Sequence, residues 1–168
     1  MKTKQIYSFI KFLIPGLLVS FFLIQCSASK KFEKLTSDDI KGMIDSSRFV
    51  FEADRVNPLR GRTRYLTSSY DVTLKKDSLE SFLPYFGRAY QAPMDPSKGG
   101  IQFTSTDFSY NVEAKGDKGW DVVIKPEDYN EVQEMRFSIF GNGSASLNVM
   151  STHRDPISFT GHIERIKE

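Results

Sequence analysis

Apolar and polar residues alternate along most of this chain, in short runs that are separated by turn-like segments. In the first run Phe49, Phe51 and Ala53 fall on one side of an extended backbone, and Glu52 falls on the other. A period of two predicts β-strands that each have one buried face. The inward positions that should share one core include Phe51, Val72, Tyr110, Val122, Phe137, Leu147 and Phe159.

Short connections between the alternating runs favour an antiparallel meander. About eight or nine strands of this kind would close into an up-and-down barrel or half-barrel, similar to a lipocalin. One of the turns, Asn142-Gly143, tolerates positive φ and suits a type I′ hairpin. A two-sheet β-sandwich would show the same alternation, so it stays as the alternative fold.

One short segment before the strands has a helical period. Ile40, Met43 and Ile44 lie on one face of a helix, and the residues from Thr36 to Asp39 supply capping oxygens and first-turn carboxylates. We predict one N-terminal helix over residues 37–46, which would cover an opening of the barrel.

The first 25 residues have the features of an export signal, with three lysines followed by a short apolar run. A transmembrane helix needs about 20 apolar residues, and this run is shorter. Residues 23–27 resemble a bacterial lipobox, in which Cys26 would carry the lipid, although a small residue is usual at the place of Gln25. Ordinary cleavage after Ala28 or Ser29, with loss of Cys26, is the alternative.

The chain is therefore expected to consist of a signal peptide (1–25), a lipidated flexible tether (26–35) and a single β domain (36–168). It contains 23 basic residues, three of them in the signal, which leaves 20 basic against 21 acidic residues in the rest. A nearly neutral domain offers no broad positive field, so we expect no nucleic-acid partner. Because Cys26 is the only cysteine, intrachain disulfides, thiol catalysis and cysteine metal sites are excluded.

Catalytic and metal-binding motifs are missing from the sequence. The glycines at 141–144 lie in a hairpin and form no phosphate loop, and the serines lack a nucleophile elbow. His153 and His162 are the only histidines, and His162 is interpreted as a surface residue. We therefore predict no enzyme activity, no cofactor and no metal. Hydrolysis of envelope sugars or peptides would require two carboxylates in one cleft, which a sequence cannot show.

The most distinctive stretch is an aromatic bend at residues 81–93, which holds Phe82, Tyr85, Phe86 and Tyr90 around Pro84, Gly87 and Pro93. Such rings either plug the end of a barrel or line a binding surface. A run of arginines at 55–64, together with Arg88, offers guanidinium groups for an anion. The candidate ligand or partner surface is therefore Tyr85, Phe86, Arg88 and Tyr90.

Several segments together resemble a bacterial family known as domain of unknown function 4251. They are Arg48-Phe49-Val50-Phe51-Glu52-Ala53, Asn57-Pro58-Leu59-Arg60-Gly61, Leu83-Pro84-Tyr85-Phe86-Gly87-Arg88-Ala89-Tyr90, Gly100-Ile101-Gln102-Phe103 and Ile157-Ser158-Phe159-Thr160-Gly161. The resemblance implies an exported, often lipidated protein of Gram-negative bacteria, and it supplies no catalytic residues.

These observations predict a membrane-anchored lipoprotein of the Gram-negative cell envelope, on the periplasmic side or at the outer membrane. It would act as a binding or structural module without catalysis, attached through the lipid on Cys26. Its partner would be a protein or a small apolar ligand. The alternative is a lipocalin-like carrier that encloses an apolar ligand.

Overall fold

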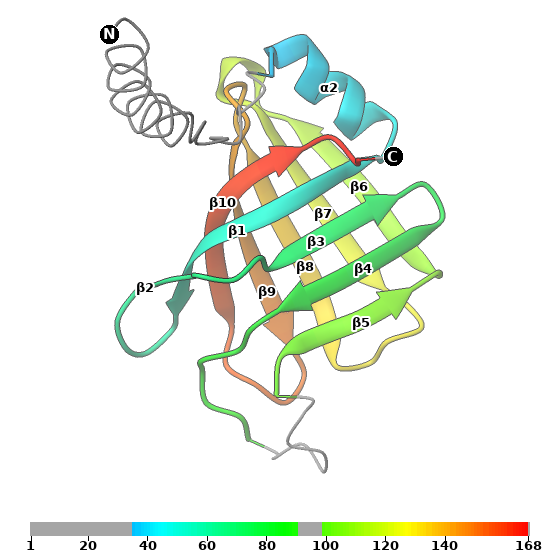
Figure 1. The fold of residues 1–168 in the computed structure, drawn as a ribbon. Helices are drawn as coiled ribbons and strands as arrows, with labels where there is room; N and C mark the ends of the chain where they lie inside the picture. The colour runs from blue at the N-terminus through cyan, green and yellow to red at the C-terminus, as the bar shows by residue number, and fades with distance from the viewer. Residues whose placement is uncertain (1–34, 91–98, 168) are drawn as a thin grey trace, which may run out of the picture. The chain divides into compact units, whose positions relative to one another are not determined.

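The computed structural model describes residues 35–90 and 99–167, which form ten strands, one α-helix and one short 3-10 helix (Figure 1). The predicted signal, the predicted tether up to residue 34 and Cys26 lie outside the described residues. The elements are α2 (Ser37–Asp45), β1 (Phe49–Pro58), β2 (Arg64–Tyr65), β3 (Asp71–Lys75), β4 (Ser78–Leu83), β5 (Ile101–Ser105), β6 (Phe108–Ala114), η2 (Gly116–Lys118), β7 (Trp120–Pro126), β8 (Val132–Ile139), β9 (Ser144–Ser151) and β10 (Ile157–Glu164).

Every strand pair is antiparallel, and the main path runs β5-β4-β3-β1-β10-β9-β8-β7-β6, with β2 attached to β1. Most neighbours in the sheet follow each other in the chain, as a meander requires. Two pairs are exceptions. β1 pairs with β3 past the short β2, and β1 pairs with β10, which joins the two ends of the domain and curls the sheet (Figure 1). The prediction of a mainly β, barrel-like fold is confirmed, and the sandwich alternative is not observed.

The barrel stays open between β5 and β6, which follow each other in the chain but do not pair. We call this unpaired junction the seam, and it is held by side-chain contacts and by the tight turn between the two strands. The backbone amides of Thr106 and Asp107 donate to the Asp128 carboxylate over 2.9 and 3.3 Å. The rings of Phe103 on β5 and Tyr129 after β7 stack with centroids 4.4 Å apart.

The interior is filled by the side chains that the alternation predicted to point inward. Phe51 and Phe137 are among the largest fully buried residues, and their rings meet edge to face with centroids 5.7 Å apart. All seven predicted core positions belong to this cluster or pack against it, with Tyr110 half-buried at its margin. A single apolar core therefore holds the sheet together.

The helix α2 matches the predicted one and ends one residue earlier. Thr36 and Asp39 form a reciprocal capping box, in which the Asp39 amide donates to the Thr36 hydroxyl and the Thr36 amide donates to the Asp39 carboxylate. Its apolar face is buried at one end of the barrel (Figure 1). Among the described residues, no helix has the length and apolar character that a membrane crossing requires.

The turn between β8 and β9 differs from the prediction of a type I′ hairpin. Only Gly143 has positive φ there, at 85°, whereas a type I′ turn needs positive φ at both central residues. The amide of Gly143 donates to the Phe140 carbonyl, which places the turn over residues 140–143 and leaves Gly143 at its end.

Candidate binding surface

The aromatic bend crosses the end of the barrel opposite α2, because it leaves β4 where β1 also ends. Its described part, residues 84–90, pairs with the loop between β9 and β10. The Tyr90 amide donates to the His153 carbonyl over 2.8 Å, and the Asp155 amide donates to the Arg88 carbonyl over 2.9 Å. The bend is therefore held in place by backbone hydrogen bonds to a segment that is distant in sequence.

Tyr85 has a structural role in this arrangement. Its hydroxyl lies 2.8 Å from the carbonyl oxygen of Arg88 and 3.0 Å from that of Asp155. Burial and the nearby Asp155 carboxylate raise the pKa of Tyr85. Gly87 is required here, because a Cβ at this position would lie 2.4 Å from the Tyr85 hydroxyl oxygen.

A buried carboxylate lies behind Tyr90. Asp155 is only 4% exposed, and the Tyr90 hydroxyl donates a hydrogen bond to it. This hydrogen bond raises the pKa of Tyr90. The Asp155 carboxylate is thus buried and hydrogen-bonded to the Tyr90 hydroxyl, while the ring of Tyr90 is exposed to solvent.

The interpretation of the aromatic bend as a plug is wrong for most of its rings. Phe82, Phe86 and Tyr90 are 48%, 39% and 64% exposed, and only Tyr85 packs against the core. Tyr65 on β2 is 77% exposed as well. Large rings that are exposed together on one surface suggest that they meet another molecule.

Arginines lie between these rings. The guanidinium of Arg64 stands 5.0 Å above the ring of Phe86, and that of Arg55 stands 5.8 Å from the ring of Tyr65. Arg60 and Arg88 are near enough for their charges to lower the pKa of Tyr90, against the larger effect of Asp155. We call this the arginine–aromatic surface, which consists of Arg55, Arg60, Arg64, Tyr65, Phe86, Arg88 and Tyr90.

The arginines of this surface form no ion pair among the described residues, although Asp54 precedes Arg55 and the Asp155 carboxylate lies at Tyr90. No acidic residue occurs between Arg55 and Tyr70 or from Pro84 to Tyr90. Elsewhere basic side chains do pair, for example Lys75 with Glu80. Charge and exposed rings therefore occur together at this end of the barrel.

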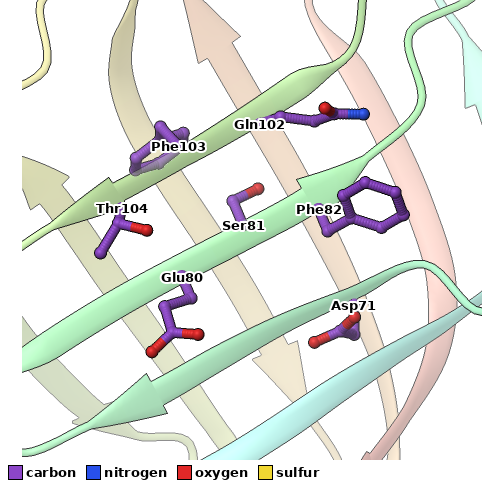
Figure 2. A pocket seen from close by; sticks show the side chains of 7 residues that line it. All are labelled: Asp71, Glu80, Ser81, Phe82, Gln102, Phe103 and Thr104. Carbon is purple, nitrogen blue, oxygen red and sulfur yellow. The ribbon is translucent and has the colours of Figure 1, made fainter.

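A hollow lies on the outer face of the sheet, over β3, β4 and β5 (Figure 2). It has a volume of about 340 Å³ and is lined by Asp71, Glu80, Ser81, Phe82, Gln102, Phe103 and Thr104. The exposed ring of Phe82 stacks on Tyr70 with centroids 5.7 Å apart. Its two carboxylates are held locally, because Thr73 donates to Asp71 and Lys75 pairs with Glu80. Asp71 and Glu80 therefore both line this open groove, and each has a local partner.

The structure thus brings the four predicted surface residues into one region but divides their roles. Tyr85 supports the bend, whereas Phe86, Arg88 and Tyr90 are exposed. Sequence reasoning missed Tyr65 as a member of this surface and missed the residues gathered around His162. In both cases strand pairing creates the neighbourhood, and no local motif marks it.

Comparisons with known proteins agree with this fold. A crystal structure of a DUF4251 family protein from Bacteroides eggerthii is similar with a TM-score of 0.55 and 15% sequence identity, over 77% of this chain and 87% of that chain. At this identity the likeness concerns the fold alone. No curated protein is significantly similar. The family model described as a domain of unknown function, DUF4251, matches residues 32–163. Because the match covers most of its length, the chain belongs to the DUF4251 family.

Proposed function

We propose that this protein is an exported, lipid-anchored envelope protein whose β domain binds a ligand bearing phosphate or carboxylate groups. The arginine–aromatic surface would form the binding site. The observation that carries the proposal is the set of four exposed arginines, interleaved with exposed rings and lacking any acidic partner among the described residues.

Arginine suits such a ligand because its planar guanidinium donates two parallel hydrogen bonds to one carboxylate or phosphate. The rings of Phe86 and Tyr65 restrict Arg64 and Arg55, since a cation over an aromatic face gains about 0.5–1 kcal/mol at an exposed site. Because these arginines are already restricted before a ligand arrives, binding costs less conformational entropy. The rings also offer flat apolar area to the rest of the ligand.

The lipocalin-like carrier has less support. The interior is occupied by large side chains such as Phe49, Phe51, Phe137 and Phe159, all of which are fully buried. A carrier of this kind would need an enclosed space for its ligand. An exposed surface is therefore the better candidate for binding.

Isothermal titration with pyrophosphate and with citrate tests the binding site. The double variant Arg64→Gln/Arg88→Gln should bind about tenfold more weakly or worse, since a hydrogen bond to a charged group contributes about 1.5–3 kcal/mol. Added NaCl should weaken wild-type binding, because the interaction is electrostatic and exposed.

Arg48→Gln is the matched control, since Arg48 is also exposed and forms no ion pair among the described residues, but lies at the α2 end of β1. It should bind like the wild type. An equal loss in the Arg48 variant, or no binding of either anion to the wild type, refutes the site. Vesicles of anionic and of zwitterionic lipid then distinguish a lipid headgroup from a free anion.

The proposed anchor rests on the lipobox-like segment around Cys26, which lies outside the described residues. Cells grown with a radiolabelled fatty acid should label the wild-type protein and leave Cys26→Ala unlabelled. Ser27→Ala keeps the cysteine and should be labelled normally. An unlabelled wild type, or equal label on Cys26→Ala, removes the anchor and leaves the binding proposal standing.

A further inference from the structure

A cluster of one histidine and three carboxylates lies on the outer face of β1 and β10. Glu52 on β1 is directly opposite His162 on β10, and Glu164 follows His162 on the same face two residues later. Their neighbours Phe51 and Ile163 point into the core. The sheet register therefore gathers three side chains that can bind a metal, one imidazole and two carboxylates, from the two ends of the domain.

A break in the strand register adds a fourth group. The pairing of β1 with β10 shifts between Ala53 and Arg55, so Asp54 has no partner of its own in the ladder. Its carboxylate oxygen lies 3.4 Å from Nδ1 of His162. On the other side of the ring, Nε2 of His162 lies 3.4 Å from a carboxylate oxygen of Glu164.

Two acceptors facing one imidazole create an electrostatic conflict. A neutral imidazole has one N–H donor and one lone pair. If Nδ1 donates to Asp54, the lone pair of Nε2 faces the Glu164 carboxylate, and the two repel each other. The 3.4 Å separations are longer than ordinary hydrogen bonds. A cation between Nε2 and the glutamates would remove the conflict.

We propose that Glu52, His162 and Glu164 bind a divalent transition-metal ion such as Zn²⁺. One ligand atom from each residue lies within 4.8 Å of the other two, so a small closing movement would bring them to coordination distance. The mixture of one imidazole and two carboxylates suits Zn²⁺ better than Ca²⁺ or Mg²⁺, which prefer oxygen ligands alone.

Asp54 has the position of an orienting residue in this site. Metal-binding histidines usually donate their other ring N–H to a carboxylate, which fixes the tautomer and the direction of the ring. Asp54 can do this through Nδ1, while Nε2 is on the side of Glu164. The side chain of His162 is only 15% exposed, so the ring is already restricted.

Positive charge competes weakly for the same carboxylates. Lys167 Nζ lies 3.4 Å from the second oxygen of Glu164, but its side chain is 77% exposed. Surface ion pairs of this kind contribute little. The three carboxylates of the cluster therefore leave an excess of negative charge that favours a divalent cation.

Zinc binding is tested on the full chain in detergent micelles, with a tag that contains no histidine. Isothermal titration should show one equivalent of Zn²⁺ per chain and no comparable binding of Mg²⁺ or Ca²⁺. The variants His162→Gln, Glu52→Gln and Glu164→Gln should each lose at least tenfold in affinity. Asp54→Asn should lose about 10- to 100-fold, as expected for an orienting partner.

His153→Gln is the matched control, because it removes the only other histidine, which lies in the exposed loop after β9. It should bind Zn²⁺ normally. Imidazole NMR signals of the wild type provide a readout that needs no variant at the site, since only His162 should shift on titration. Absence of stoichiometric zinc binding, unchanged binding in His162→Gln, or a shift of His153 alone overturns the proposal and leaves the anion surface unaffected.

Discussion

Gly161 shows how much a single residue can decide in this sheet. It pairs with Ala53 at the start of the irregular register between β1 and β10. A Cβ at Gly161 would lie 1.9 Å from the carbonyl oxygen of Glu52, a distance that side chains do not tolerate. The reason for glycine is therefore the close approach of two backbones. The same approach holds Glu52 against His162.

We expect Gly161→Ala to lower the free energy of unfolding by about 1–3 kcal/mol, the usual cost of overpacking a tight site. Gly42→Ala is the control, because nothing lies within 4 Å of a Cβ there and alanine favours the helix by about 0.5–1 kcal/mol. Urea unfolding followed by circular dichroism measures both changes. Equal stabilities for wild type and Gly161→Ala would contradict this account of the contact.

At the scale of residues, the sequence predicted the inward positions well and the functional positions poorly. Alternation alone places Phe137 or Leu147 in the core, because their burial depends on a local period. The exposure of Phe86 and the surroundings of His162 depend on contacts between distant segments. His162 was predicted to be a lone surface residue, and only the register with Glu52 shows its neighbours.

At the scale of elements, the short helix α2 is tied to the barrel by Tyr110 of β6. The Tyr110 hydroxyl donates to the carbonyl oxygen of Ile44 over 2.8 Å, near the end of the helix where carbonyls lack helical partners. Burial raises the pKa of Tyr110 to about 12 from its ordinary 10.0. The neutral hydroxyl is thus the form that the folded protein prefers.

The linkage of this tyrosine to pH has a definite sign. The unfolded chain loses the proton near pH 10, whereas the folded protein keeps it up to about pH 12. The stabilising contribution is therefore complete below pH 10 and is lost as the pH rises from 10 to 12. Tyr110→Phe should lower the free energy of unfolding by about 1 kcal/mol at pH 7. Between pH 10 and 12 the free energy of unfolding should fall less steeply in the variant than in the wild type.

Urea unfolding at a series of pH values up to 12 measures the difference between wild type and Tyr110→Phe. The pKa of Tyr129 is also raised to about 12, first by burial, so some alkaline loss remains in the variant. Tyr65→Phe, at an exposed ring on β2, serves as the control and should follow the wild type. Parallel curves for wild type and Tyr110→Phe would contradict the linkage.

The sequence predicted the helix correctly but not the type of the turn between β8 and β9. The helix follows from Thr36, Asp39 and the apolar face, because a capping box and a helical period are local signals. The turn at Asn142-Gly143 was predicted as a type I′ hairpin, and the type was wrong, since within this turn only Gly143 has positive φ. Turn type depends on the register of both flanking strands, and the dipeptide alone does not fix it.

For the whole molecule, the pairing of the first and last strands separates a barrel from a sandwich. Both folds need the same alternation, so the sequence left the choice open. The structure decides it through the long ladder between β1 and β10, which runs from Val50 opposite Glu164 to Pro58 opposite Ile157. The same ladder carries the proposed metal site and ends beside the arginine–aromatic surface.

The open seam between β5 and β6 is expected to be the least stable junction of the barrel, because no backbone ladder joins these two strands. Every other junction of the main path is a backbone ladder, whereas this one depends on one stacked pair of rings and on the hydrogen bonds to Asp128. Opening the seam would break no strand pair, although it would also pull the buried Ile101 of β5 out of the core. Breathing of the domain would therefore start here, and a loosened seam would expose apolar side chains well before the fold is lost.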